Sequence, residues 1–231
     1  MFAESPTEQT TAITDLLLSL QAIGAIWVLK RNQIRRPVWT ELWTWFLGLL
    51  SAASLLGAIS HGIKMTSSVN TALWVVIYLV LGIMMALFLV AAVTLHWDPQ
   101  LGKRCLPYGM VIAFVFFLVT QIWSDSFLLF VVYEAISMLL ALALYLSCFW
   151  LRREKGTGLL AAGIIVGIVA AALDAQPSVQ LNFIWTFNNH GVFHLVQMIS
   201  LLFLTFGVCS THRAATENQT APASHNTAGA L

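Results

Sequence analysis

Two histidines four residues apart are the first side chains in this chain that could do chemistry. His190 and His194 lie in "HGVFH", at the start of a long apolar run. Residues i and i+4 share one helical face, with Cβ atoms about 5–6 Å apart, so both imidazoles can hold one ion. His61, in "GAISHGIK", adds a third imidazole from a distant part of the chain. Three histidines and a water are typical of catalytic zinc, so we predict a zinc site at His61, His190 and His194.

Two carboxylates lie in or beside the apolar runs. Glu134, in "FVVYEAISM", lies about 12 Å, or two turns, inside its predicted helix. Asp174 ends another apolar run, next to Gln176 and Pro177. Ionisable groups inside a bilayer are expensive and mark sites by default. Because a carboxylate near a metal can take a proton from water, we assign Glu134 and Asp174 as candidate general base or fourth ligand.

Each of these residues also has an ordinary interpretation. The histidines can be interfacial residues that hydrogen-bond to loop backbone. Asp174 is equally well explained as a residue of a helix-end loop. Glu134 is harder to dismiss, because a carboxylate at membrane depth needs a partner or a proton.

The composition predicts the kind of protein that positions these residues. The chain is 59% hydrophobic and 9% charged, whereas soluble proteins average about 45–50% apolar and about 25% charged residues. These values predict an integral membrane protein. The N-terminus carries only acidic charges before its first apolar run, so we expect that run to be a retained helix rather than a signal peptide. The absence of a basic patch with interleaved aromatic residues in the sequence argues against nucleic acid as a partner.

Seven apolar runs are long enough for the roughly 20 residues that a membrane-spanning helix needs. We predict an all-α, polytopic seven-helix bundle, because lipid otherwise admits only barrels, whose strands alternate in polarity. The predicted domain organisation is a short N-terminus over residues 1–10, a transmembrane domain over 11–209, and a disordered cytoplasmic tail over 210–231. The predicted spans are 11–29, 40–63, 71–95, 106–123, 126–150, 157–174 and 188–209.

Basic residues between the runs predict the orientation. Lys64 alone lies on one predicted side. The other side holds Lys30, Arg31, Arg35, Arg36, Lys103, Arg104, Arg152, Arg153, Lys155 and Arg213. By the positive-inside rule the N-terminus is outside, the C-terminus is cytoplasmic, and the histidines and carboxylates lie in the outer half of the membrane.

The pattern resembles the CREST superfamily of seven-helix membrane metalloproteins, which includes alkaline ceramidases, progestin and adipoQ receptors and the hemolysin III group. That superfamily has a histidine late in the second helix, here His61, and an HxxxH early in the seventh, here "HGVFH". The resemblance implies a zinc ion and hydrolysis of a membrane lipid amide or ester. Two positions depart from it. Gly57 stands where the family has a serine, and "NTALWVVIYLV" offers no acid where the family has an aspartate.

The segment "FNNHGVFHLVQ" also resembles a group of uncharacterised bacterial membrane proteins with N-x-x-x-x-H-x-x-Q at this helix. That resemblance implies a location in a bacterial inner membrane. Three other functions remain open. The histidines can form a non-catalytic pin or ligand sensor between the second and seventh helices. They can ligate haem or sit beside a quinone. A transporter is a further alternative, although no helix broken by Pro or Gly with charges at mid-membrane favours it.

Overall fold

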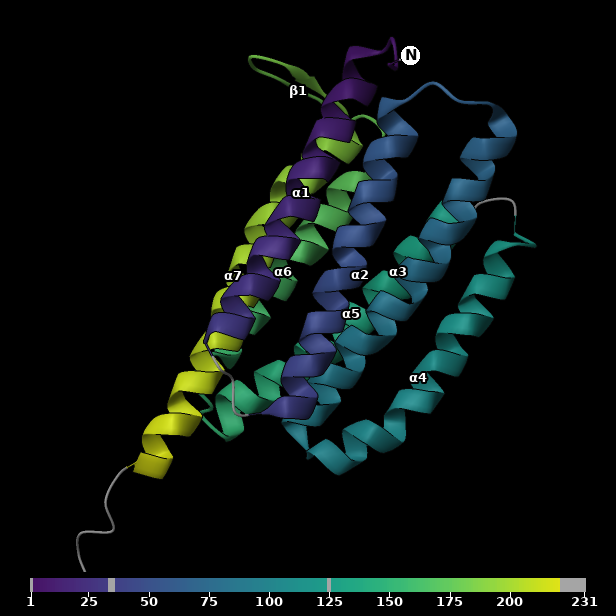
Figure 1. Ribbon diagram of the computed structural model, residues 1–231. Helices are drawn as coiled ribbons and strands as arrows, with labels where there is room; N and C mark the ends of the chain where they lie inside the picture. Colours follow the sequence, from purple (N-terminus) through teal and green to yellow (C-terminus); the bar gives the residue numbers. More distant parts are fainter. Residues whose placement is uncertain (1, 33–35, 124–125, 221–231) are drawn as a thin grey trace, which may run out of the picture.

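Seven helices account for most of the chain in the computed structural model, which describes residues 2–32, 36–123 and 126–220 (Figure 1). Each of the seven is long and apolar enough to cross a membrane, so the protein is a multi-pass membrane protein with a seven-helix bundle. In chain order the elements are α1 Pro6–Arg31, α2 Pro37–Gly62, α3 Ser67–His96, α4 Pro99–Thr120, α5 Ser126–Leu151, α6 Thr157–Asp174, the strands β1 Leu181–Asn182 and β2 Thr186–Phe187, and α7 Asn189–Thr220.

Three helix ends differ most from the predicted spans. Helix α1 begins at Pro6 rather than at residue 11, because proline suits the first position of a helix. Helix α4 begins at Pro99 rather than at 106 and contains Pro107. Proline inside a helix removes a backbone hydrogen bond, and α4 bends near its first turns (Figure 1). Helix α7 continues to Thr220, beyond the predicted domain end at 209.

Six of the helices form a closed ring, and α4 lies outside it. Helix α1 packs between α2 and α7, α3 joins α2 to α5, and α6 joins α5 to α7. Helix α4 packs mainly on α3 (Figure 1). The outward side of α4 exposes apolar side chains such as Tyr108, Val111 and Phe114, as a surface facing lipid requires.

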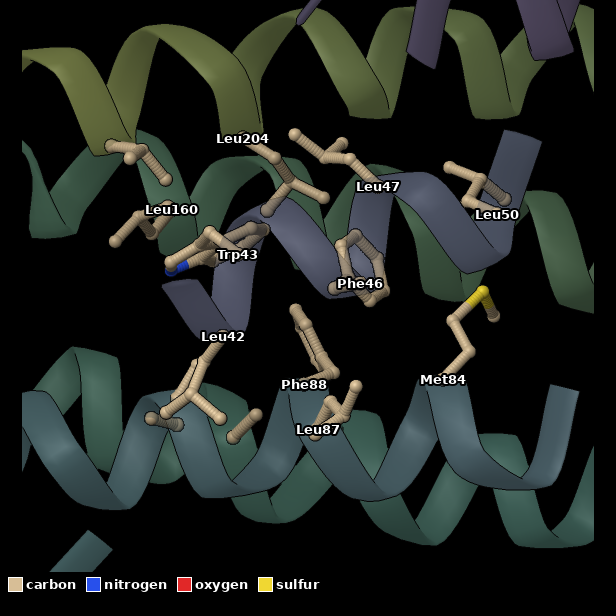
Figure 2. Close-up of a cluster of buried hydrophobic side chains, with 14 of the residues drawn as sticks. Leu42, Trp43, Phe46, Leu47, Leu50, Met84, Leu87, Phe88, Leu160 and Leu204 are labelled. Carbon is tan, nitrogen blue, oxygen red and sulfur yellow. The ribbon is translucent and has the colours of Figure 1, made fainter. Parts of the chain in front are cut away.

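Large side chains fill one half of this ring. Trp43 of α2 packs edge-on against Phe46 at 5.3 Å and against Phe88 of α3 at 5.8 Å between ring centroids. Figure 2 shows these side chains of α2 lying between α3 on one side and Leu160 of α6 and Leu204 of α7 on the other. The close approach of α6 and α7 needs small residues, since a Cβ on Gly163 would lie 2.9 Å from Leu204.

The two ends of the bundle differ in charge. The N-terminus and the short β1–β2 hairpin lie at one end (Figure 1). The opposite end carries Lys30, Arg31, Lys103 and Arg104, together with an ion pair of 2.7 Å between Arg36 and Glu154. Arg35, the side chain of Arg213 and residues 221–231 of the predicted tail lie outside the described part of the chain. The assignment of the N-terminal end to the outside remains a prediction.

Candidate functional site

All five predicted site residues line one cavity at the N-terminal end of the ring. The cavity has a volume of about 430 Å³, within the usual range for small-molecule sites. His61 comes from the last turn of α2, His190 and His194 from the first turns of α7, Asp174 from the end of α6, and Glu134 from α5. The fold therefore brings the histidines and both carboxylates to the same space.

Two of the histidines are held by carboxylates on their Nδ1 atoms. Nδ1 of His61 lies 2.7 Å from Oε2 of Glu8, and Nδ1 of His190 lies 2.7 Å from Oδ1 of Asp174. An imidazole that donates its Nδ1 proton to a carboxylate keeps its lone pair on Nε2. This is the usual arrangement behind a metal-binding histidine, in which the carboxylate fixes the ring and its tautomer.

His194 is the most buried of the three and has a partner at each ring nitrogen. Its Nδ1 lies 3.1 Å from Oγ1 of Thr14, and its Nε2 lies 3.3 Å from Oδ1 of Asp15. The Thr14 hydroxyl group has one proton to donate. Its Oγ1 atom lies 2.9 Å from the carbonyl oxygen of Thr11. When Thr14 donates this proton to the Thr11 carbonyl, its Oγ1 atom accepts a hydrogen bond from Nδ1 of His194. Nδ1 then carries the ring proton, so the lone pair on Nε2 faces the Asp15 carboxyl group. Two facing acceptors need a proton or a cation between them.

Asp15 occupies space that exists because residue 57 is glycine. A Cβ on Gly57 would lie 2.7 Å from Oδ2 of Asp15 and 3.1 Å from its Cγ. Asp15 is only 5% exposed and lines the same cavity as the histidines. The resemblance to the CREST superfamily predicts a serine at position 57 of α2. The space of such a side chain is therefore filled by the Asp15 carboxyl group of α1.

Replacing Gly57 with leucine should destabilise the protein. The new side chain must displace the Asp15 carboxyl group, and overpacking of this kind costs about 1–3 kcal/mol. The apparent Tm should fall by about 2–4 °C for each kcal/mol lost. Gly48→Leu on the same helix is the matched control, because nothing lies within 4 Å of a Cβ there. An equal loss of Tm in both variants would contradict this account.

The three imidazoles approach one another without forming a closed ligand set. The ring centroids of His61 and His190 are 6.1 Å apart, and His194 lines the same cavity. Over residues 2–32, 36–123 and 126–220, no group of three His, Cys, Asp or Glu side chains is arranged to hold a metal ion directly. The predicted zinc ligands thus share a cavity but are not drawn together.

Aromatic residues form much of the cavity wall. The ring of Trp74 packs edge-on against His61 at 5.9 Å, and Phe127 packs edge-on against His190 at 5.7 Å. Tyr78, Phe130 and Phe193 also line the space. The polar groups are therefore placed within a mostly apolar and aromatic enclosure, which suits a ligand with a hydrocarbon portion.

Hydrogen bonds join the ends of several elements at the N-terminal end of the bundle. The backbone nitrogen of Ala3 donates to the carbonyl of Gly62 at 3.0 Å. Thr10 donates to the carbonyl oxygen of Thr186 in β2 at 2.8 Å, and Thr11 donates to Oδ1 of Asn188 at 2.9 Å. These hydrogen bonds tie α1 to the ends of α2 and the β1–β2 hairpin, and so fix the helix that carries Asp15.

Sequence analysis missed the contribution of α1 and of Gln197. Glu8, Thr14 and Asp15 contact the three histidines. In the sequence analysis the acidic residues of this segment were considered only as charges that precede the first apolar run. Asp15 is followed by "LLLSL", and an acid beside such a run is the signal that could have identified it. Gln197 lines the cavity three residues after His194 and belongs to the N-x-x-x-x-H-x-x-Q pattern, whose glutamine received no role.

Comparison with known proteins gives one family match. The model of a family of unknown function, DUF6962, matches residues 10–212. That range includes Asp15, Gly57 and every predicted site residue. No curated protein and no solved structure matches the chain.

Proposed function

We propose that this chain, which belongs to the DUF6962 family of unknown function, is a membrane-embedded metalloprotein that holds zinc with His61, His190 and His194. The observation that carries the proposal is the meeting of these three imidazoles, from the end of α2 and the start of α7, at one cavity. Their likeness in position to the histidines of the CREST superfamily supports the same conclusion.

The chemistry of the donors fits zinc. Glu8 and Asp174 each hold an Nδ1 atom, which leaves the Nε2 lone pair of His61 and of His190 available for an ion. The Asp15 carboxyl group beside His194 adds the negative charge that a divalent cation favours. Because the rings of His61 and His190 are 6.1 Å apart, ion binding requires them to draw together. The cavity between them leaves room for that movement.

The same arrangement supports hydrolysis of an amide or ester in a membrane lipid. A bound zinc ion would polarise the substrate carbonyl and activate water at neutral pH. Among the carboxylates, Asp15 is the best placed to accept the proton from that water, because it faces His194 in the cavity. Asp174 is engaged with His190 and acts as a positioning residue. The aromatic wall of Trp74, Phe127 and their neighbours would hold the hydrocarbon chain of the lipid.

The proposed location is the outer half of a bacterial inner membrane. The cavity is lined by residues at the end of the bundle that holds the N-terminus. The cluster of basic residues lies at the other end. The positive-inside rule supports a cytoplasmic position for the basic end. Substrate would then reach the site from the outer leaflet.

Metal analysis tests the proposal directly. Protein purified without added metal should contain about one zinc per chain, as three-histidine sites do. Removing the ion with a chelator should lower the apparent Tm, and adding zinc should restore it, because an ion that binds only the folded state stabilises it. A preparation without zinc would exclude this function. A preparation with a Soret absorption band would also exclude it and would favour the haem alternative.

Catalysis and a structural pin are separated by turnover. A panel of long-chain acyl amides and esters should contain a substrate whose hydrolysis stops on chelation and resumes on adding zinc. If zinc stabilises the protein and the panel is not hydrolysed, the ion acts as a pin between α2 and α7. If zinc affects neither stability nor turnover, both the catalytic role and the structural role of the ion are excluded.

A further inference from the structure

We propose that Glu134 and Gln197 form a second polar subsite, at the inner end of the cavity, that binds the ammonium group of an amphiphilic amine. This inference goes beyond the metal site, because neither residue is among its proposed ligands. It depends on the cavity and on the charges that line it.

Gln197 presents a hydrogen-bond acceptor that no described residue uses. Its side chain lines the cavity and is 7% exposed, and its buried Oε1 atom has no hydrogen-bond partner among the described residues. An unpaired buried acceptor costs about 1–3 kcal/mol. Gln197 follows His194 by three residues on α7, which places it about 4.5 Å further along the helix axis. The acceptor therefore lies deeper in the bundle than the histidines and is available to a ligand.

Glu134 supplies a carboxyl group at the same depth. It is 5% exposed and lines both the main cavity and a small void beneath it, as Gln197 also does. Phe46, Leu50 and Met84 border that void with apolar side chains. Figure 2 shows these three side chains in the space between α2 and α3. Glu134 and Gln197 thus lie in a mostly apolar floor, whose other polar lining residue, Ser200, donates its hydroxyl proton to the carbonyl oxygen of Gly163.

The charges around the cavity indicate what these acceptors bind. Asp15, Glu134 and Asp174 line it, whereas its described lining includes no lysine or arginine. Asp174 pairs with His190, and Asp15 faces His194. Within the described part of the chain no ion pair joins Glu134 to a basic side chain. A carboxyl group at membrane depth needs a partner or a proton, and an ammonium ligand would supply both the charge and the donor that Glu134 lacks among the described residues.

The walls of the cavity favour an organic cation over a simple ion. Trp74, Tyr78 and Phe130 line the cavity, and aromatic rings attract ammonium groups through their π faces. An ammonium group can donate to the Glu134 carboxylate and to Oε1 of Gln197 together, since it carries three protons. Its hydrocarbon chain would lie against the apolar wall. An alcohol offers only one donor and no charge, and a fatty acid would be repelled by Glu134.

Three probes of equal chain length test this subsite. The wild-type protein in nanodiscs of zwitterionic lipid should bind octylammonium at least about tenfold more tightly than 1-octanol, with octanoate weakest, as expected for a charge-assisted contact. Calorimetric titration of the protein, corrected for empty nanodiscs, measures the three affinities. Glu134→Gln should remove most of the preference for octylammonium. Gln197→Leu should reduce the preference less, since it removes one neutral acceptor.

Matched variants separate this inference from the proposed metal function. Glu41→Gln, an exposed carboxylate on α2 that does not line the cavity, should keep the full preference. His194→Ala should lose zinc but keep the preference for octylammonium. If Glu134→Gln does not fold, Gln197→Glu adds a second carboxylate and should increase the preference. Equal binding of octylammonium and octanol by the wild type, a Glu134→Gln variant that keeps the preference, or a Gln197→Glu variant that does not increase it would overturn the proposal.

Discussion

His194→Ala should empty the metal site and reduce zinc affinity by about 100-fold or more. His194 is the most buried of the three histidines and lies between Thr14 and Asp15, so no other side chain of α7 can take its place. Removing one of three imidazoles leaves a site with two nitrogen ligands, and even loss of an outer partner costs about 10–100-fold. The zinc content of purified protein, measured by elemental analysis, should fall from about one per chain to background.

A histidine at the other end of the bundle gives the matched control for this change. His96 ends α3 and contacts Sγ of Cys148 at 3.5 Å, far from the cavity residues in the fold. His96→Ala should therefore retain its zinc. Equal zinc content in His194→Ala and in the wild type would show that the three imidazoles do not hold the ion. Loss of zinc in both variants would point to a general loss of folding.

Asp15→Asn should keep zinc and lose turnover by about 100-fold or more, the range expected for loss of a general base. Asparagine has nearly the shape of aspartate, so it should fill the space beside Gly57 without new contacts. It cannot accept a proton from water as a carboxylate does. The comparison uses a lipid amide or ester from the panel for which the wild type meets the proposed expectation of zinc-dependent hydrolysis, with metal content measured on the same samples.

Asp98→Asn is the isosteric control at the opposite end of the bundle. Oδ1 of Asp98 caps α4 by accepting from the backbone nitrogens of Gln100 and Leu101, and asparagine can do the same. Its turnover should equal that of the wild type. If Asp15→Asn loses zinc together with turnover, Asp15 is a ligand rather than a proton acceptor. If it loses neither, the general base is another residue.

The site residues divide into those that sequence reasoning identified and those that it missed. His190 and His194 were identified because helical periodicity alone puts i and i+4 on one face. His61 was identified by its position at a helix end and by resemblance. Asp15 lies within the predicted first span, 11–29, but it was counted with the acidic charges that precede the apolar run and was given no role. Gly57 was interpreted as a departure from the serine of the CREST superfamily. In the structure this glycine makes room for Asp15.

The sequence by itself determined the seven membrane-crossing helices, because a bilayer imposes a run length that composition reveals directly. It also determined that one end of the bundle is basic and that two histidines share a face of α7. The tertiary structure decided that α1 supplies Glu8, Thr14 and Asp15 to these histidines, and that Glu134 and Gln197 share the floor of one cavity. Helix periodicity states which residues share a face. Which faces meet depends on side-chain packing between helices distant in sequence, and no local pattern encodes it.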